Sequence, residues 1–99
     1  MELTSKQKKQ LRGLGQGIEA AATVGKAGLT QGVVEGISIL LGHQELLKVR
    51  IPTGSGDQRQ QMGDDLAART NSALIGVVGR TVLLYRENPD LPPEKRLHF

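Results

Sequence analysis

The residues best suited to binding chemistry lie at positions 25–28, where Gly25, Lys26, Ala27 and Gly28 precede a segment typical of a helix. Because Gly25 and Gly28 lack side chains, a phosphodiester could approach the main chain there. The unsatisfied N–H groups at the start of a following helix, together with its dipole, favour a negative ligand. Lys26 adds a mobile cation. These features predict a loop that binds phosphate groups.

The four-residue pattern is weak evidence by itself. The chain contains 13 glycines, and Gly76 and Gly79 repeat the same spacing. That second copy falls in a β-rich segment without an internal cation or a following helix, so we interpret it as a strand glycine and a hairpin turn. For residues 25–28 the alternative is a simple loop that leads into a helix.

The distribution of charge also favours an anionic partner. Residues 1–50 contain seven Lys or Arg against four acidic residues, whereas residues 51–99 contain six of each. Four of these cations occupy seven consecutive positions without an acidic residue among them: Lys6, Lys8, Lys9 and Arg12. Such local density attracts phosphate polymers, although a solvated helix face would have the same composition.

The other polar residues do not suggest catalysis. The absence of cysteine excludes disulfides, thiolate nucleophiles and thiolate metal ligands, and it favours a reducing compartment such as the cytoplasm. His43 and His98 have no partners at metal-ligand spacing, and no nucleotide-binding P-loop pattern occurs. We therefore expect no enzymatic activity, no cofactor and no metal.

The small number of aromatic residues constrains how a nucleic acid would bind. Tyr85 and Phe99 are the only aromatic side chains, whereas sheets that stack bases need several exposed rings. We expect recognition of backbone and shape instead. Tyr85, at the end of a predicted strand, is more typical of the edge of a core.

The first half of the chain is expected to form two helices and two strands. Thr4 or Ser5 can cap a basic helix that ends among Gly13, Gly15 and Gly17, because each glycine costs about 1 kcal/mol in a helix interior. Residues 20–24 predict a short buried strand. A helix capped by Thr30 and ending near Gly42 follows, and then residues 46–51 alternate as a strand with Lys48 and Arg50 on the face opposite its apolar residues.

The second half completes a single α/β domain. Asp57 can cap a third helix that ends at residues 70–71, and residues 73–78 and 81–86 predict an antiparallel hairpin around residues 79–80. The order α-β-α-β-α-β-β predicts three helices packed on a four-stranded mixed sheet over residues 1–86. The Pro- and charge-rich residues 87–99 are expected to form a flexible tail. Since no apolar run approaches the roughly 20 residues needed to span a bilayer, we expect no membrane association.

Several segments resemble the CRM domain, and specifically the stand-alone bacterial YhbY-like proteins. They are VGKAGLT at residues 24–30, HQELLKVR at 43–50 and VGRTVLLYR at 78–86, together with the basic TSKQKKQLR at 4–12. The resemblance covers about residues 3–86. Four segments in the family's order and at its spacing are far more specific than the glycine pattern alone. The sequence departs from the family at Ala27, where Asn is frequent, and at residues 18–22, which lack a common proline.

The resemblance implies an RNA-binding domain similar in fold to the C-terminal domain of the third translation initiation factor. It also implies association with ribosomal RNA in precursors of the large ribosomal subunit, with ribosomal proteins as further candidate partners, and hence a role in ribosome assembly. The family's loop maps onto residues 25–28. Its basic surface maps less specifically onto Lys6, Lys8, Lys9, Arg12, Lys48, Arg50, Arg80 and Arg86. The alternative is a protein-interaction module whose first helix and tail dock on a ribosomal or assembly protein.

Overall fold

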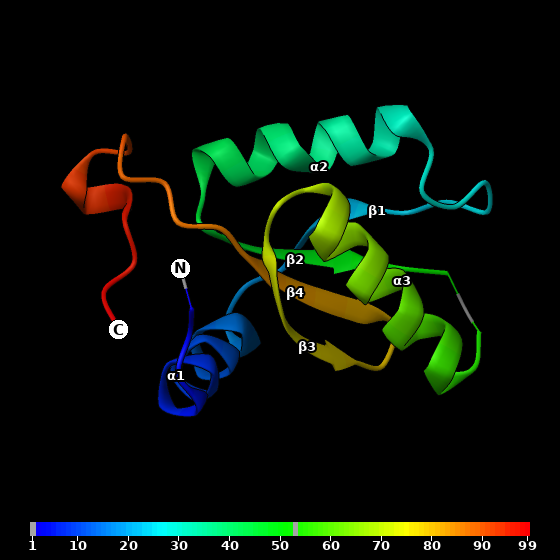
Figure 1. The fold of residues 1–99 in the computed structure, drawn as a ribbon, viewed down its shortest axis with the longest axis horizontal. Helices are drawn as coiled ribbons and strands as arrows, with labels where there is room; N and C mark the ends of the chain where they lie inside the picture. Colours follow the sequence, from blue (N-terminus) through cyan, green and yellow to red (C-terminus); the bar gives the residue numbers. More distant parts are fainter. Residues whose placement is uncertain (1, 53) are drawn as a thin grey trace.

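A computed structural model describes residues 2–52 and 54–99, and it places a four-stranded sheet among three helices (Figure 1). The elements are α1 (Ser5–Gln16), β1 (Ala20–Thr23), α2 (Gln31–His43), β2 (Leu46–Arg50), α3 (Gly56–Arg69), β3 (Ala73–Val78), β4 (Thr81–Tyr85) and the short 3-10 helix η1 (Pro93–Lys95). Apart from η1, this is the predicted order of helices and strands.

The sheet has the strand order β1-β2-β4-β3. β1 runs parallel to β2, whereas β4 is antiparallel to both of its neighbours, β2 and β3. The turn between β3 and β4 contains Gly79 with a φ of 56°, a conformation that glycine adopts without steric cost. The predicted mixed sheet and the predicted terminal hairpin are therefore confirmed.

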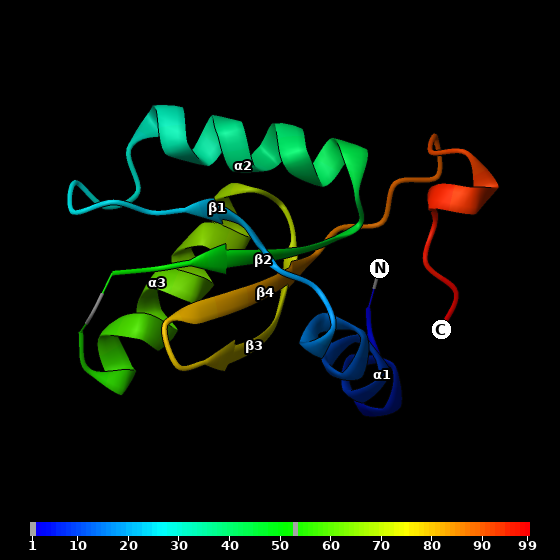
Figure 2. The same ribbon diagram turned by 180° about the vertical axis from the view of Figure 1, so that it is seen from behind.

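The two faces of the sheet are covered differently (Figures 1 and 2). The larger core joins one face to α2 and α3, through Val24, Val34, Ile37, Leu41, Leu47, Val49, Ile51, Leu66, Ala67, Val82 and Leu84. A smaller core on the other face packs Leu46, Ile75, Leu83 and Tyr85 against Leu11 of α1, with Leu97 and Phe99 at its edge. Because strand side chains alternate, Lys48 and Arg50 lie on the face of this smaller core, as predicted.

Helix α1 ends within the predicted glycine cluster, at the last of its three glycines. Thr4 caps it in a reciprocal capping box with Gln7, the helix continues through Gly13 and Gly15, and Gly17 forms its C-cap. Gly15 is buried against the side chain of Leu83, where an added Cβ would clash. Close packing of α1 on the sheet thus compensates for the low helix propensity of glycine.

Smaller differences concern the ends of other elements. Ser55, not Asp57, caps α3, because its hydroxyl accepts a hydrogen bond from the Gln58 N–H while the Gln58 side chain bonds back to the Ser55 N–H. Helix α2 ends at His43, one residue beyond Gly42, and β4 ends at Tyr85. A capping box needs a partner three residues along the chain, which Ser55 has in Gln58.

The C-terminal segment packs on the domain in the structure, and the flexibility expected of this tail stays a prediction. Glu45 is 1% exposed, and its carboxylate accepts hydrogen bonds from the Asn88 N–H at 2.7 Å and the Leu97 N–H at 2.8 Å. The Phe99 ring packs edge-on against Tyr85, with ring centroids 5.3 Å apart. The segment has too few apolar residues to fold alone, so its contacts come from the domain.

In the part of the chain that the structure describes, no helix is long and apolar enough to cross a bilayer.

Candidate nucleic-acid interface

Three of the predicted cationic residues line one groove on the face of the smaller core. Lys48 and Arg50 are alternate residues of β2, and Arg12 comes from α1. Two adjoining hollows share Lys48 and Thr81; Arg12 and Gln16 line the first, and Thr23 and Arg50 line the second. We call these two hollows together the basic groove; their lining is completed by Gly15, Ile18, Glu19, Ala20, Gly76, Val78 and Leu83.

The loop of residues 25–28 continues from one end of the basic groove. Thr23, the last residue of β1, lies opposite Arg50 in the parallel pair of strands. The loop begins two residues later and extends past the end of the sheet, next to the start of α2 (Figure 2). The parallel pairing of β1 and β2 therefore places the glycine loop and Arg50 at the same end of the sheet.

The loop itself is a tight turn. The Gly28 N–H donates to the Gly25 carbonyl at 3.0 Å, and Gly28 has a φ of 76°. Gly25, Lys26 and Ala27 are exposed, so the side chain at the tip and the adjacent main chain face solvent. An added Cβ at Gly25 would meet no atom within 4 Å. The free space at Gly25 leaves room for a ligand to approach its backbone.

The N-terminus of α2 is only partly open to a ligand. Helix α2 begins at Gln31, and the Thr30 hydroxyl accepts a hydrogen bond from the Val33 N–H at 3.2 Å. The Thr30 N–H also donates to the Gly28 carbonyl at 3.0 Å, so two of the four N–H groups that lack a partner within the helix are already satisfied. The first turn contains no acidic residue, so the helix dipole still favours an anion there.

Arg69 supports the loop from α3, a contact that was not predicted from the sequence. Its Nη1 atom donates to the Leu29 carbonyl at 2.7 Å, directly after the loop. The two residues are 40 positions apart, and no local pattern links them. Arg69 therefore holds the chain between the loop and α2 and is a positioning residue for the candidate interface.

The basic groove has few acidic side chains near it. Within residues 2–52 and 54–99, the ion pairs join Arg96 to Glu45 and Glu87, so none of the groove cations has an acidic partner within 4.0 Å. Glu19 is the one acidic residue in the lining of the basic groove. Asp57, Asp64 and Asp65 are exposed on α3, which packs on the opposite face of the sheet. The basic groove therefore has the charge that attracts phosphates.

The remaining predicted cations of α1 and the β-hairpin are exposed but do not line the groove. Lys6, Lys8 and Lys9 lie on α1, and Arg80 lies in the turn between β3 and β4. They add exposed positive charge to α1 and the β3-β4 hairpin, both of which contribute other residues to the lining of the groove.

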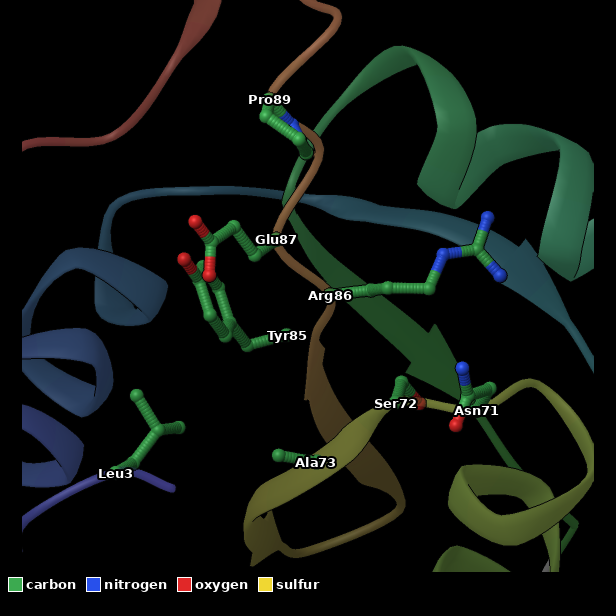
Figure 3. A pocket seen from close by; sticks show the side chains of 8 residues that line it. All are labelled: Leu3, Asn71, Ser72, Ala73, Tyr85, Arg86, Glu87 and Pro89. Carbon is green, nitrogen blue, oxygen red and sulfur yellow. The ribbon is translucent and has the colours of Figure 1, made fainter. Parts of the chain in front are cut away.

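Arg86 has a different environment. Its Nη1 atom donates to the Ser38 hydroxyl at 2.9 Å and the Thr70 carbonyl at 2.8 Å, and its Nη2 atom donates to the Ser38 carbonyl at 2.6 Å. Figure 3 shows the Arg86 side chain pointing away from Tyr85 and Glu87, toward α2. The guanidinium joins the end of β4 to α2 and the end of α3, so we leave Arg86 out of the proposed RNA surface.

The site offers no arrangement for metal binding among the described residues, which contain no cluster of three or more His, Cys, Asp or Glu able to hold an ion. The groove instead combines cations, two threonine hydroxyls and an amide with apolar residues of the strands. Such a surface suits binding of a polyanion.

Comparison with known proteins places this chain in a family. Residues 3–86 match the model of the CRS1 / YhbY (CRM) domain, and the chain belongs to that family. It is 36% identical over 97 residues to the probable RNA-binding protein PA4753 of Pseudomonas aeruginosa, covering 98% of this chain and 91% of that protein. It is 31% identical over 88 residues to a Haemophilus influenzae protein named RNA-binding protein, with 89% of each covered.

The fold has a close match among solved structures. The solution structure of the hypothetical protein SAV1595 from Staphylococcus aureus aligns with a TM-score of 0.84 at 31% identity, over 98% of this chain and 100% of that one. The resemblance noted from the sequence and the α/β fold class expected from it are thus confirmed.

Proposed function

We propose that this chain is an RNA-binding protein without enzymatic activity, which holds RNA phosphates in the basic groove and on the loop of residues 25–28. The observation that carries the proposal is the placement of Arg12, Lys48 and Arg50 along one groove, with no acidic partner within ion-pair distance. Because cations that bind phosphates release the counterions of the RNA, they contribute directly to affinity. The names of the bacterial relatives support RNA as the polyanion.

The loop adds main-chain donors to this surface. Gly25 leaves its backbone open, Lys26 supplies a charge, and Arg69 fixes the chain that follows. The exposed cations of α1 and Arg80 extend the area over which RNA would be attracted. In this arrangement the loop and the groove bind successive parts of one RNA backbone.

We further propose that the RNA belongs to precursors of the large ribosomal subunit, so that the protein acts in ribosome assembly in the cytoplasm. The resemblance to the stand-alone YhbY-like proteins supports this. Sedimentation of a cell extract at low and high salt tests it: the protein should travel with large-subunit precursors and be released by salt. A protein that stays at the top of the gradient in both conditions would contradict it.

The groove is tested by neutralising its cations. Lys48→Gln and Arg50→Gln should each weaken binding of a short single-stranded RNA and reduce the slope of log affinity against log salt by about 0.7 for each phosphate that the variant no longer neutralises. Lys95→Gln is the matched control, because Lys95 is an exposed cation in η1, outside the groove. An equal decrease of affinity in all three variants would show general attraction to net charge and contradict the groove.

The second candidate function is a protein-interaction module. The salt dependence of binding affinity distinguishes it from RNA binding. The affinity of a mainly apolar interface responds weakly to ionic strength, whereas the affinity of phosphate contacts responds steeply. The basic composition of α1 and the groove favours RNA over this alternative.

A further inference from the structure

The first hollow of the basic groove differs in character from a simple phosphate track. It is a cavity of about 170 Å³ between the C-terminal half of α1 and the β3-β4 hairpin. Its apolar lining consists of Gly15, Gly76, Val78 and Leu83, and its polar lining of Arg12, Gln16, Lys48 and Thr81. Clefts for drug-sized ligands measure roughly 300–1,000 Å³, so this cavity suits only a small group.

Two glycines shape the cavity. Gly15 lets α1 lie directly against Leu83, which forms part of the lining. At Gly76, an added Cβ would come within 3.5 Å of the Arg12 Cδ, so the stem of Arg12 passes over the strand at the point where β3 has no side chain. Arg12 is held there by the hydrogen bond from its Nη1 to the Ile75 carbonyl at 3.1 Å. The guanidinium is therefore kept at the edge of the cavity.

The cavity also contains an apolar side chain, Val78, that is unusually exposed to solvent. Val78 is 74% exposed, more than Leu14 at 44% or Ile39 at 63%, and it lines this cavity. Val78 ends β3, a strand at the edge of the sheet. A phosphate gains nothing from an exposed valine, whereas a flat heterocycle can cover it and bury apolar surface.

We propose that this cavity binds one unpaired base of the RNA, whose neighbouring phosphates lie along Lys48 and Arg50. The inference rests on the proposed function. Val78 and Leu83 contact the base through apolar atoms, and the Arg12 guanidinium packs on its face, as Arg does with unstacked bases. The Gln16 amide, which has both donors and an acceptor, faces the edge of the base. The protein thereby selects RNA with a bulged or single-stranded nucleotide despite lacking aromatic stacking residues.

The experiment compares two RNA hairpins with equal numbers of phosphates. One contains a single bulged nucleotide, and in the other that nucleotide is abasic. The unmodified protein should bind the first hairpin about fivefold more tightly, the effect expected from burying about 40 Å² of apolar surface. Val78→Thr, which is nearly isosteric and exposed, and Gly76→Ala, which partly fills the cavity, should both bring the affinity ratio toward one.

The outcomes separate the two proposals. Lys95→Gln should keep the ratio of the unmodified protein. If both hairpins bind with equal affinity and salt dependence, the base site is overturned while RNA binding by the groove stands. If neither hairpin nor single-stranded RNA binds, the proposed function itself fails. If Val78→Thr lowers the affinity for both hairpins equally, Val78 contacts the backbone and the base site is again overturned.

Discussion

Gly15 of α1 lies so close to the side chain of Leu83 in β4 that no Cβ fits between them. This contact places α1 against the sheet, and it thereby forms one wall of the basic groove. Gly15, which lowers the helix propensity of α1, is thus also the residue that allows the helix to dock.

The two glycines inside α1 should respond oppositely to alanine. Gly13→Ala meets no atom within 4 Å and should stabilise the protein by up to about 1 kcal/mol through helix propensity. Gly15→Ala should destabilise it by about 1–3 kcal/mol, because Leu83 is buried and must move. Urea unfolding measures both changes. An equal gain in stability for both variants would show that Leu83 repacks freely.

Gly25 and Gly28 of the loop should also respond differently to substitution by alanine. Gly28 has a φ of 76°, so Gly28→Ala should cost about 1–2 kcal/mol of folding stability. Gly25→Ala has free space and should leave stability nearly unchanged, yet weaken RNA binding by keeping the phosphodiester away from the main chain. The measurement combines thermal unfolding with RNA titration. Full RNA affinity in a folded Gly25→Ala protein would contradict the backbone contact.

Arg86 should matter for stability more than for RNA. Removing its three hydrogen bonds in Arg86→Ala should cost on the order of 2–4 kcal/mol, and Arg86→Lys should recover little, because an ammonium cannot replace the planar fork. Chemical unfolding and RNA titration below the unfolding midpoint check this. An unchanged midpoint with weaker RNA binding would return Arg86 to the RNA surface that the family resemblance implies.

Glu45 should control whether the C-terminal segment stays docked. In Glu45→Gln one carboxylate oxygen is replaced by an amide NH₂ group, which then faces a backbone N–H donor. The free energy of unfolding should fall by about 1–3 kcal/mol, and hydrogen exchange at the Leu97 N–H should become faster. Glu87→Gln is the control, since its pair with Arg96 is at the surface and contributes at most about 1 kcal/mol. Fast exchange at Leu97 already in the unmodified protein would support the flexible tail expected from the sequence.

Tyr85 should make stability depend on alkaline pH. Burial raises the pKa of Tyr85 above its ordinary value of 10.0, with further increases from Glu45 and Glu87 and a partial decrease from Arg96. The pKa of Tyr85 is higher in the folded than in the unfolded protein, so the neutral phenol contributes to the free energy of unfolding. This contribution is fully present below pH 10.0 and is lost as the pH rises through the pKa of the folded protein. Tyr85→Phe should lose less stability above pH 10.0 than the unmodified protein in urea unfolding. Identical pH profiles would exclude the phenol as the cause.

The amino-acid sequence by itself determined the order of elements and their faces. Alternation at residues 46–51 predicted that Lys48 and Arg50 share a face, and Thr30 predicted the start of α2, because strand periodicity and N-capping are local. It also predicted the hairpin around Gly79, whose backbone conformation needs only the residues of the turn.

Tertiary structure decided the features that depend on distant partners. The sequence predicted that α1 would end among its glycines, as it does at Gly17, but helix propensity contains no information about Leu83, against which Gly15 packs inside the helix. It assigned Arg86 to RNA by resemblance, whereas Ser38 and Thr70 occupy its guanidinium, and it gave no sign that Glu45 would anchor residues 88–97. Packing and hydrogen bonding between segments far apart in the chain set these roles, and such contacts exist only once the sheet has brought the segments together.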